Sequence, residues 1–288
     1  MLLDFFYKLI DVPFRVRNAL RRRSHRVHIF STAEDKSDSQ VAFYEDAVDR
    51  IVNSERSFNR FRRIYDYREI LEHVDYRLGK AYLAVAKSRN AEVFHLLSNS
   101  KANDKFGKPR IYKYVGIGKT SPTSLRYIAV ASDLANLLKM ETQNRIAEIG
   151  GGYGGQALVL SQLNLFSSYD IYDLPNVQRL IEKYLRINLI TNVSYPSIQA
   201  EPKKTYDLVI SNYAFSELPR KIQDLYLDKI ILGSKRGYMI MNSGLSNKTG
   251  RSDGKITLEE LRRLIPSIKV CDEMPLTSQD NYLVTWGM

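Results

Sequence analysis

Residues 144–156 read NRIAEIGGGYGGQ, and this stretch decides the fold. It opens with the short apolar segment 146–149, which is typical of a buried strand, and five of the next six residues are glycine. Glycines at a strand-to-helix turn adopt left-handed backbone conformations and let a ligand approach the main chain closely. The spacing Gly150-x-Gly152-x-x-Gly155 matches a dinucleotide-binding fingerprint, although a purely structural turn would also be rich in glycine.

Short apolar runs alternate with helical patterns after this stretch. Strands are expected at 146–149, 169–173, 193–195, 206–211, 238–241, 268–270 and 282–286, and helices at 157–165, 177–189, 222–230 and 257–265. Such alternation predicts an α/β fold with a mostly parallel sheet covered on both faces. The last two strands have no helix between them, so we expect them to pair antiparallel.

The residues before this region have a different pattern. Apolar residues recur at helical spacing through 39–100, a polar loop is expected at 99–110, and another helix is expected from about Ser121-Pro122 to Lys139. Ser121 suits the cap of that helix, and Pro122 suits its first turn.

The composition restricts the compartment and the partners. The chain has 288 residues, a formal net charge of +11 and a single cysteine, Cys271, so no intrachain disulfide is possible and a cytoplasmic location is expected. Residues 1–28 carry a net charge of +5 and many apolar residues. They either lie on an anionic membrane surface, at its inner face, or pack as an ordinary helix. Basicity alone does not indicate nucleic acid, and we expect no nucleic-acid partner.

The glycine run also fits a second template. The spacing Glu148-x-Gly150-x-Gly152-x-Gly154 resembles the first motif of class I methyltransferases that depend on S-adenosylmethionine (SAM). In that class the acid faces the cationic methionine end of SAM, a role that a dinucleotide pyrophosphate would oppose electrostatically. Asp173 ends the next expected strand, where a carboxylate accepts hydrogen bonds from both ribose hydroxyls, as it also does in nicotinamide enzymes.

Four segments narrow the resemblance. They are AEIGGGYGGQALVL from Ala147, YDIYDLPNV from Tyr169, YDLVISNYAFSELP from Tyr206 and GYMIMN from Gly237. Together they resemble a bacterial family of sugar O-methyltransferases. The resemblance covers about residues 110–288, which divides the chain into a basic amphipathic arm (1–30), a helical extension (31–110) and a SAM-dependent methyltransferase domain (111–288).

The resemblance implies a fold, a cofactor and a reaction. The fold is the class I Rossmann-like sheet of seven mostly parallel strands with the last strand antiparallel. The reaction is methyl transfer from SAM to a sugar hydroxyl during surface polysaccharide or glycolipid synthesis. The residues that it places against SAM are Glu148, Gly150, Gly151, Gly152, Gln156, Asp173, Leu174 and Asn212, with Tyr127 and Arg126 capping the cofactor. For Arg126, a structural ion pair remains an alternative.

The acceptor side is less determined. Glu217, five residues past Asn212, is the candidate general base, and a capping role for Ser216-Glu217 at the next helix is the alternative. A histidine base would have to come from His73 or His95. Tyr213 and Tyr153 are expected to line the acceptor site, and Arg251 and Asp253 to reach it from a glycine-rich loop. No carboxylate cluster is apparent, so we expect no metal.

Three other functions remain open at this stage. They are a SAM-dependent methyltransferase acting on another acceptor such as RNA, a nicotinamide-dependent oxidoreductase, and a non-catalytic subunit with the same fold. The sequence leaves the oligomeric state undetermined.

Overall fold

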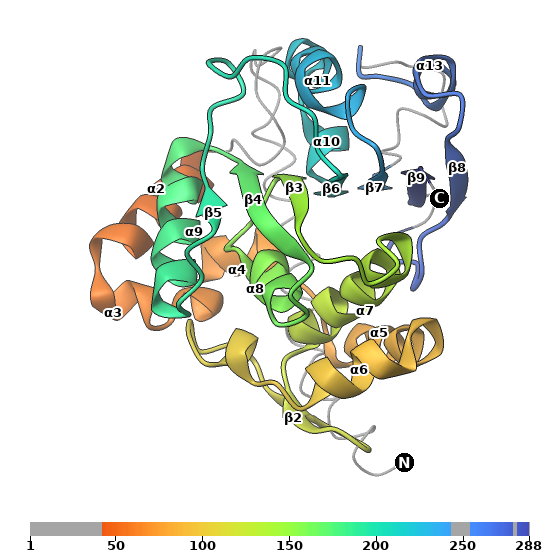
Figure 1. Ribbon diagram of the computed structural model, residues 1–288. Helices are drawn as coiled ribbons and strands as arrows, with labels where there is room; N and C mark the ends of the chain where they lie inside the picture. Colours follow the sequence, from red (N-terminus) through yellow and green to blue (C-terminus); the bar gives the residue numbers. More distant parts are fainter. Residues whose placement is uncertain (1–41, 243–253, 279–280, 288) are drawn as a thin grey trace.

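The computed structural model describes residues 42–242, 254–278 and 281–287 (Figure 1). Its helices are α2 (Ala42–Asn53), α3 (Glu55–Phe58), η1 (Phe61–Arg63), α4 (Tyr65–Leu71), α5 (Tyr76–Arg89), α6 (Ala91–Ser98), η2 (Ala102–Asp104), α7 (Pro122–Leu137), α8 (Gly155–Ser161), α9 (Pro175–Ile187), α10 (Ala214–Glu217), α11 (Arg220–Tyr226), η3 (Leu227–Ile231) and α13 (Leu258–Leu264). Its strands are β1 (Tyr112–Tyr114), β2 (Gly118–Thr120), β3 (Asn144–Ile149), β4 (Phe166–Tyr172), β5 (Val193–Ser194), β6 (Leu208–Asn212), β7 (Gly237–Met241), β8 (Lys269–Asp272) and β9 (Tyr282–Trp286).

Seven of the strands form one sheet in the order β5-β4-β3-β6-β7-β9-β8. The pairs from β5 to β7 are parallel, whereas β9 runs antiparallel to both of its neighbours. This confirms the expected seven-stranded, mostly parallel sheet with its last strand antiparallel. The sheet also departs from the all-parallel 3-2-1-4-5-6 strand order of dinucleotide-binding domains. Here the reversed strand β9 lies between β7 and β8, which correspond to strands 5 and 6 of that order.

Helices cover both faces of the sheet. In Figure 1, α10, α11 and α13 lie on the opposite side of the sheet from α7 and α8. The apolar side chains divide in the same way, because alternate residues of a strand point to opposite faces. Ile146 of β3 belongs to the larger core, with α7, α8 and α9, and Ala147 and Ile149 belong to the smaller core, with η3 and α13.

Local sequence explains where two of the helices begin. Ser121 Oγ accepts a hydrogen bond from the backbone N–H of Ser124 at 3.1 Å, and Pro122 occupies the first turn of α7, as expected. At α13, Thr257 and Glu260 form a reciprocal capping box.

The helical extension is broken rather than continuous. Residues 42–98 form α2 to α6 with the short helix η1 between them, and the unexpected hairpin of β1 and β2 follows. Tyr44, Val48 and Ile51 of α2 are buried as their helical spacing indicates, and they belong to the same core as α7 and α9. Residues 42–110 therefore share one hydrophobic core with the sheet domain, so the boundary at 110 does not separate two cores.

The amphipathic arm at 1–30 lies outside the described residues, and so do its expected membrane contacts. Among the residues that are described, no helix combines the length and the apolar character needed to cross a bilayer.

Candidate active site

The glycine loop at 150–155 joins the end of β3 to the start of α8. Gly150, Gly152 and Gly154 all have positive φ angles, of 82°, 62° and 87°. At Gly150 a side chain is also excluded by space, because a Cβ would lie 2.2 Å from the Cβ of Ala214. The residue types in this loop are therefore required by its conformation, and the loop presents main chain rather than side chains at the edge of the sheet.

Asp173 links the end of β4 to this loop. Its Oδ1 accepts a hydrogen bond from the N–H of Leu174 at 2.8 Å, and its Oδ2 accepts one from the N–H of Gly152 at 3.3 Å. Burial raises the pKa of Asp173 to about 6, against the opposing effect of the backbone donors. The carboxylate is thus ionised at neutral pH and is held at the carboxyl edge of the sheet, where parallel α/β folds bind ligands.

Glu148 lies one strand away and is almost fully buried. Its side chain is 2% exposed, and its Oε2 accepts a hydrogen bond from the Tyr169 hydroxyl at 3.0 Å. Burial raises the pKa of Glu148 to about 8, with an opposing contribution from the Tyr169 hydrogen bond and a reinforcing one from Asp173. A cation brought to this position would favour the ionised carboxylate.

The end of β6 supplies two further residues. The Oδ1 atom of Asn212 is buried and has no hydrogen-bond partner among the described residues. Tyr213, the next residue, has a φ of 75°, an unusual conformation for a bulky side chain that concentrates at functional sites. A buried acceptor without a donor, at the edge where β3 and β4 also end, fits a ligand that brings the donor.

The Tyr213 hydroxyl donates a hydrogen bond to Glu273, which sequence reasoning did not single out. Glu273 directly follows β8, is buried, and also accepts hydrogen bonds from Thr277 Oγ1 at 2.6 Å and Asn281 Nδ2 at 3.2 Å. Tyr213 is thereby fixed over the end of the sheet. The available signal was an acid directly after a strand, at the edge where β6 also ends.

Glu217 is the last residue of α10, the short helix that follows the end of β6. Asn242 Nδ2 donates a hydrogen bond to its Oε1 at 2.6 Å. The capping alternative fails, because the following helix, α11, has Pro219 at its N-cap and no side-chain hydrogen bond there. Glu217 is partly exposed and is oriented by Asn242, which directly follows β7, and this suits a group that exchanges protons with a ligand.

Tyr127 and Gln156 pack behind the glycine loop. A Cβ on Gly155 would lie 2.3 Å from the Tyr127 ring, so the glycine permits the contact. Gln156 is fully buried, its Nε2 donates to the Tyr127 carbonyl at 3.4 Å, and its Oε1 has no partner within the described chain. Gly151 also faces inward, because a Cβ there would meet Ile171 at 2.4 Å. These residues shape the loop from beneath.

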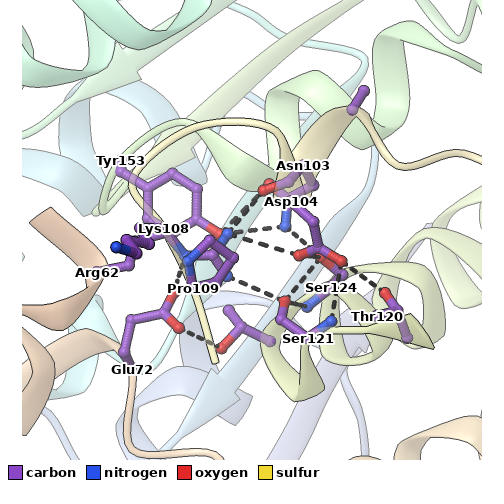
Figure 2. Close-up of polar contacts among 12 residues, drawn as sticks. Arg62, Glu72, Asn103, Asp104, Lys108, Pro109, Thr120, Ser121, Ser124 and Tyr153 are labelled. Atoms are coloured by element: carbon purple, nitrogen blue, oxygen red, sulfur yellow. Dashed lines mark hydrogen bonds and ion pairs between the residues drawn. The ribbon is translucent and has the colours of Figure 1, made fainter. Parts of the chain in front are cut away.

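The acceptor role expected for Tyr153 is wrong. Its side chain is fully buried, its hydroxyl lies 3.1 Å from Asn103 Nδ2, and the guanidinium of Arg62 stacks on its ring with 4.9 Å between the Arg62 Cζ and the ring centroid (Figure 2). Sequence spacing does not show to which side of the loop the single aromatic residue turns. Arg251 and Asp253, also expected at the acceptor site, lie outside the described residues.

The helical extension covers the same edge. A Cβ on Gly152 would contact the Leu71 side chain at the end of α4 at 3.7 Å. Asp173 is close enough to Tyr44 of α2 to raise the pKa of that phenol, after burial itself. The helical extension therefore covers part of the site.

The two histidines considered as bases lie in the same extension. His95 is exposed on α6, and Nδ1 of His73 lies 3.1 Å from the Ile70 carbonyl oxygen.

No group of three or more His, Cys, Asp or Glu side chains within the described ranges is arranged to hold a metal ion.

No protein-family model and no curated protein matches the chain. Solved structures with a similar fold include a protein from Galdieria sulphuraria described as a sarcosine dimethylglycine methyltransferase (18% identity, TM-score 0.40, covering 52% of this chain and 64% of that one). A second is a precorrin-6y C5,15-methyltransferase from Geobacter metallireducens (14% identity, TM-score 0.38, covering 55% of this chain and 86% of that one). A third is the bifunctional kinase-methyltransferase WbdD (12% identity, TM-score 0.42, covering 56% of this chain and 38% of that one). The chain thus spans less than two thirds of the first and the last of these proteins. At such low identities and TM-scores, the likeness assigns neither ligand nor activity to this chain.

Proposed function

We propose that this chain is a SAM-dependent O-methyltransferase whose acceptor is a sugar hydroxyl, acting in polysaccharide or glycolipid synthesis in the cytoplasm. The observation that carries the proposal is the arrangement of Glu148, the glycine loop and Asp173 at the carboxyl edge of a sheet with a reversed last strand. The reversed strand also argues against the nicotinamide alternative, whose domain is parallel throughout.

The residues present fit SAM by their chemistry. Asp173 would accept hydrogen bonds from the ribose hydroxyls, and the backbone of Gly150 and Gly152 would line the cofactor. Glu148 would face its ammonium group, and the buried Oδ1 of Asn212 would accept a hydrogen bond that no described residue supplies. SAM supplies an electrophilic methyl group when bound.

The protein's own contribution is positioning and proton transfer. A neutral sugar hydroxyl is a weak nucleophile, and a general base typically contributes about 10²–10⁴ in rate. Glu217 is the candidate for that base, because Asn242 orients it beside the end of β6. Tyr213, held by Glu273, would bound the acceptor pocket on the same side.

The test is calorimetric titration with S-adenosylhomocysteine, the product form of SAM. Wild-type protein is expected to bind it in the micromolar range, and Asp173→Ala is expected to abolish binding. Asp224→Ala, an exposed acid on α11 that pairs with Arg220, is the matched control and should bind normally. Folded wild-type protein that binds NADH and not S-adenosylhomocysteine would refute the proposal.

A further inference from the structure

Arg126, in the second turn of α7, is a buried cation without a carboxylate partner. Arg126 is 8% exposed, and no acid of the described ranges lies within ion-pair distance of its guanidinium. Its guanidinium hydrogen-bonds with the Tyr127 side chain, its Cζ lies 5.2 Å from the Tyr127 ring centroid, and the phenols of Tyr82 and Tyr213 also lie near it. Arginine is rarely buried unless it is paired, because the lost hydration must be replaced.

A second buried arginine shows how this fold satisfies such a group. Arg62 is fully buried, and its Nε donates to Glu72 Oε1 at 2.6 Å. Its Nη1 donates to the Asn103 carbonyl at 2.6 Å and lies 3.7 Å from Asp104 Oδ1 (Figure 2). Two carboxylates thus compensate Arg62. Arg126 is nearly as buried and pairs with no carboxylate of the described ranges, so the structural ion pair that was the alternative for it is not formed among those residues.

The phenols around Arg126 do not supply the missing charge. Burial raises the pKa of Tyr82 to about 12 and raises the pKa values of Tyr127 and Tyr213 as well, so all three are neutral at pH 7. The acid beyond them, Glu273, is occupied by Tyr213, Thr277 and Asn281. Within the described residues, the Arg126 charge therefore lies at a position that is only 8% exposed and has no carboxylate beside it.

The position of Arg126 indicates which kind of ligand would pair with its guanidinium. Tyr127, which it contacts, packs on Gly155 at the end of the glycine loop, and the charge of Glu148 acts on the same phenol. Glu148 and Arg126 therefore both lie near Tyr127 and do not pair with each other. Arg126 is cationic, and Glu148, whose pKa is raised to about 8 by burial, would ionise when a cation approaches it. A ligand with an ammonium and a carboxylate on one carbon would satisfy both groups.

We propose that Arg126 binds the carboxylate of the amino-acid end of the cofactor, opposite the ammonium-binding Glu148. This rests on the proposed function, because the zwitterion is the methionyl part of SAM. Arg126 then discriminates the complete cofactor from nucleosides that lack the amino acid, which Asp173 would still hold by their ribose.

The experiment compares two ligands on four proteins. Dissociation constants are measured for S-adenosylhomocysteine and for 5′-methylthioadenosine, which has the nucleoside and the sulfur but no amino acid. The proteins are wild type, Arg126→Gln, Arg126→Lys and Arg89→Gln. Arg89 is the matched control, because it is a half-exposed arginine that pairs with Asp133.

Arg126→Gln should weaken the binding of S-adenosylhomocysteine roughly 10- to 100-fold, the usual effect of losing hydrogen bonds to a charged group. It should leave the dissociation constant of 5′-methylthioadenosine unchanged. The affinity of Arg126→Lys for S-adenosylhomocysteine should lie between those of wild type and Arg126→Gln, since lysine keeps the charge but not the bidentate geometry. Arg89→Gln should change neither constant. Without ligand, Arg126→Gln should unfold at the same urea concentration as wild type or a higher one, because it removes an uncompensated charge.

Three results would overturn the inference. Equal weakening of both ligands would show a general structural defect. Unchanged S-adenosylhomocysteine binding with lost turnover would assign the guanidinium to an anionic acceptor. A strongly destabilised Arg126→Gln protein would show that Arg126 is already compensated. Failure of wild type to bind S-adenosylhomocysteine would instead overturn the proposed function together with this inference.

Discussion

Replacing Glu148 by glutamine should change how the stability of the ligand-free protein depends on pH. Glutamine has nearly the same shape, and its amide oxygen still accepts the hydrogen bond from Tyr169. It removes only the titration. In the folded wild type, burial holds the pKa of Glu148 at about 8, whereas an unfolded glutamate titrates near 4.3.

The magnitude follows from the difference between these pKa values. Between about pH 4.5 and pH 8 the folded protein keeps a proton on Glu148 that the unfolded chain has released, so the free energy of unfolding falls as pH rises. The stabilisation by the protonated side chain is complete below the unfolded pKa and disappears as pH passes the folded one. The slope is about 1.4 kcal/mol per pH unit, or roughly 2.7 kcal/mol between pH 5.5 and 7.5.

The assay is urea unfolding at pH 5.5, 6.5 and 7.5 and constant ionic strength. Other titrating groups are common to both proteins, so the difference between their stability curves reports the titration of Glu148 together with its interaction with Asp173. The stability of Glu148→Gln relative to wild type should rise with pH by the amount given above. Glu259→Gln, whose parent side chain is 82% exposed, is the control and should parallel wild type.

Parallel pH profiles for wild type and Glu148→Gln would refute the reasoning, because they would show that Glu148 is ionised in the folded protein throughout this range. That result would also remove the argument that a cationic ligand is needed to ionise it.

Three further variants test the site and its support. Glu217→Gln should lower methyl transfer at least 100-fold in a turnover assay while S-adenosylhomocysteine affinity stays within twofold, since it removes a proton acceptor and not a cofactor contact; near-normal turnover would remove Glu217 as the base. Glu72→Gln should destabilise the protein by about 3–5 kcal/mol in urea unfolding, because it leaves the buried Arg62 partly uncompensated, and a loss below 1 kcal/mol would contradict this. Gly155→Ala should cost about 1–3 kcal/mol, because the new Cβ would overlap the Tyr127 ring; unchanged stability would show that the ring has room to move.

The sheet was predictable because its signals are local. The strand before Gly150, the acid at the end of β4 and the apolar stripe of α9 each lie in one short window, and the order of such units restricts the topology. The strands expected at 282–286 and near 268–270 were both found, and they pair antiparallel as β9 and β8.

The parts of the site that were missed depend on contacts distant in sequence. Glu273 meets Tyr213 across 60 positions, only because β8 and β9 return to the edge where β6 ends. Tyr153 was expected to line the acceptor site, but its phenol turns to Asn103, 50 positions earlier. Side-chain direction in a loop is set by such partners, and no periodicity reports it.

The contacts of α2 have a consequence for how the chain folds. Asn176 Nδ2 donates to the Glu45 carbonyl at 3.2 Å, and Arg179 pairs with Asp49 at 2.7 Å. The surface that α2 covers thus belongs to α9, about 130 positions later in the chain. During synthesis α2 leaves the ribosome before α9 exists, so this part of the cover cannot pack until about 130 further residues have been made. Non-local pairing of this kind slows folding, and chaperones would have most to protect in that interval.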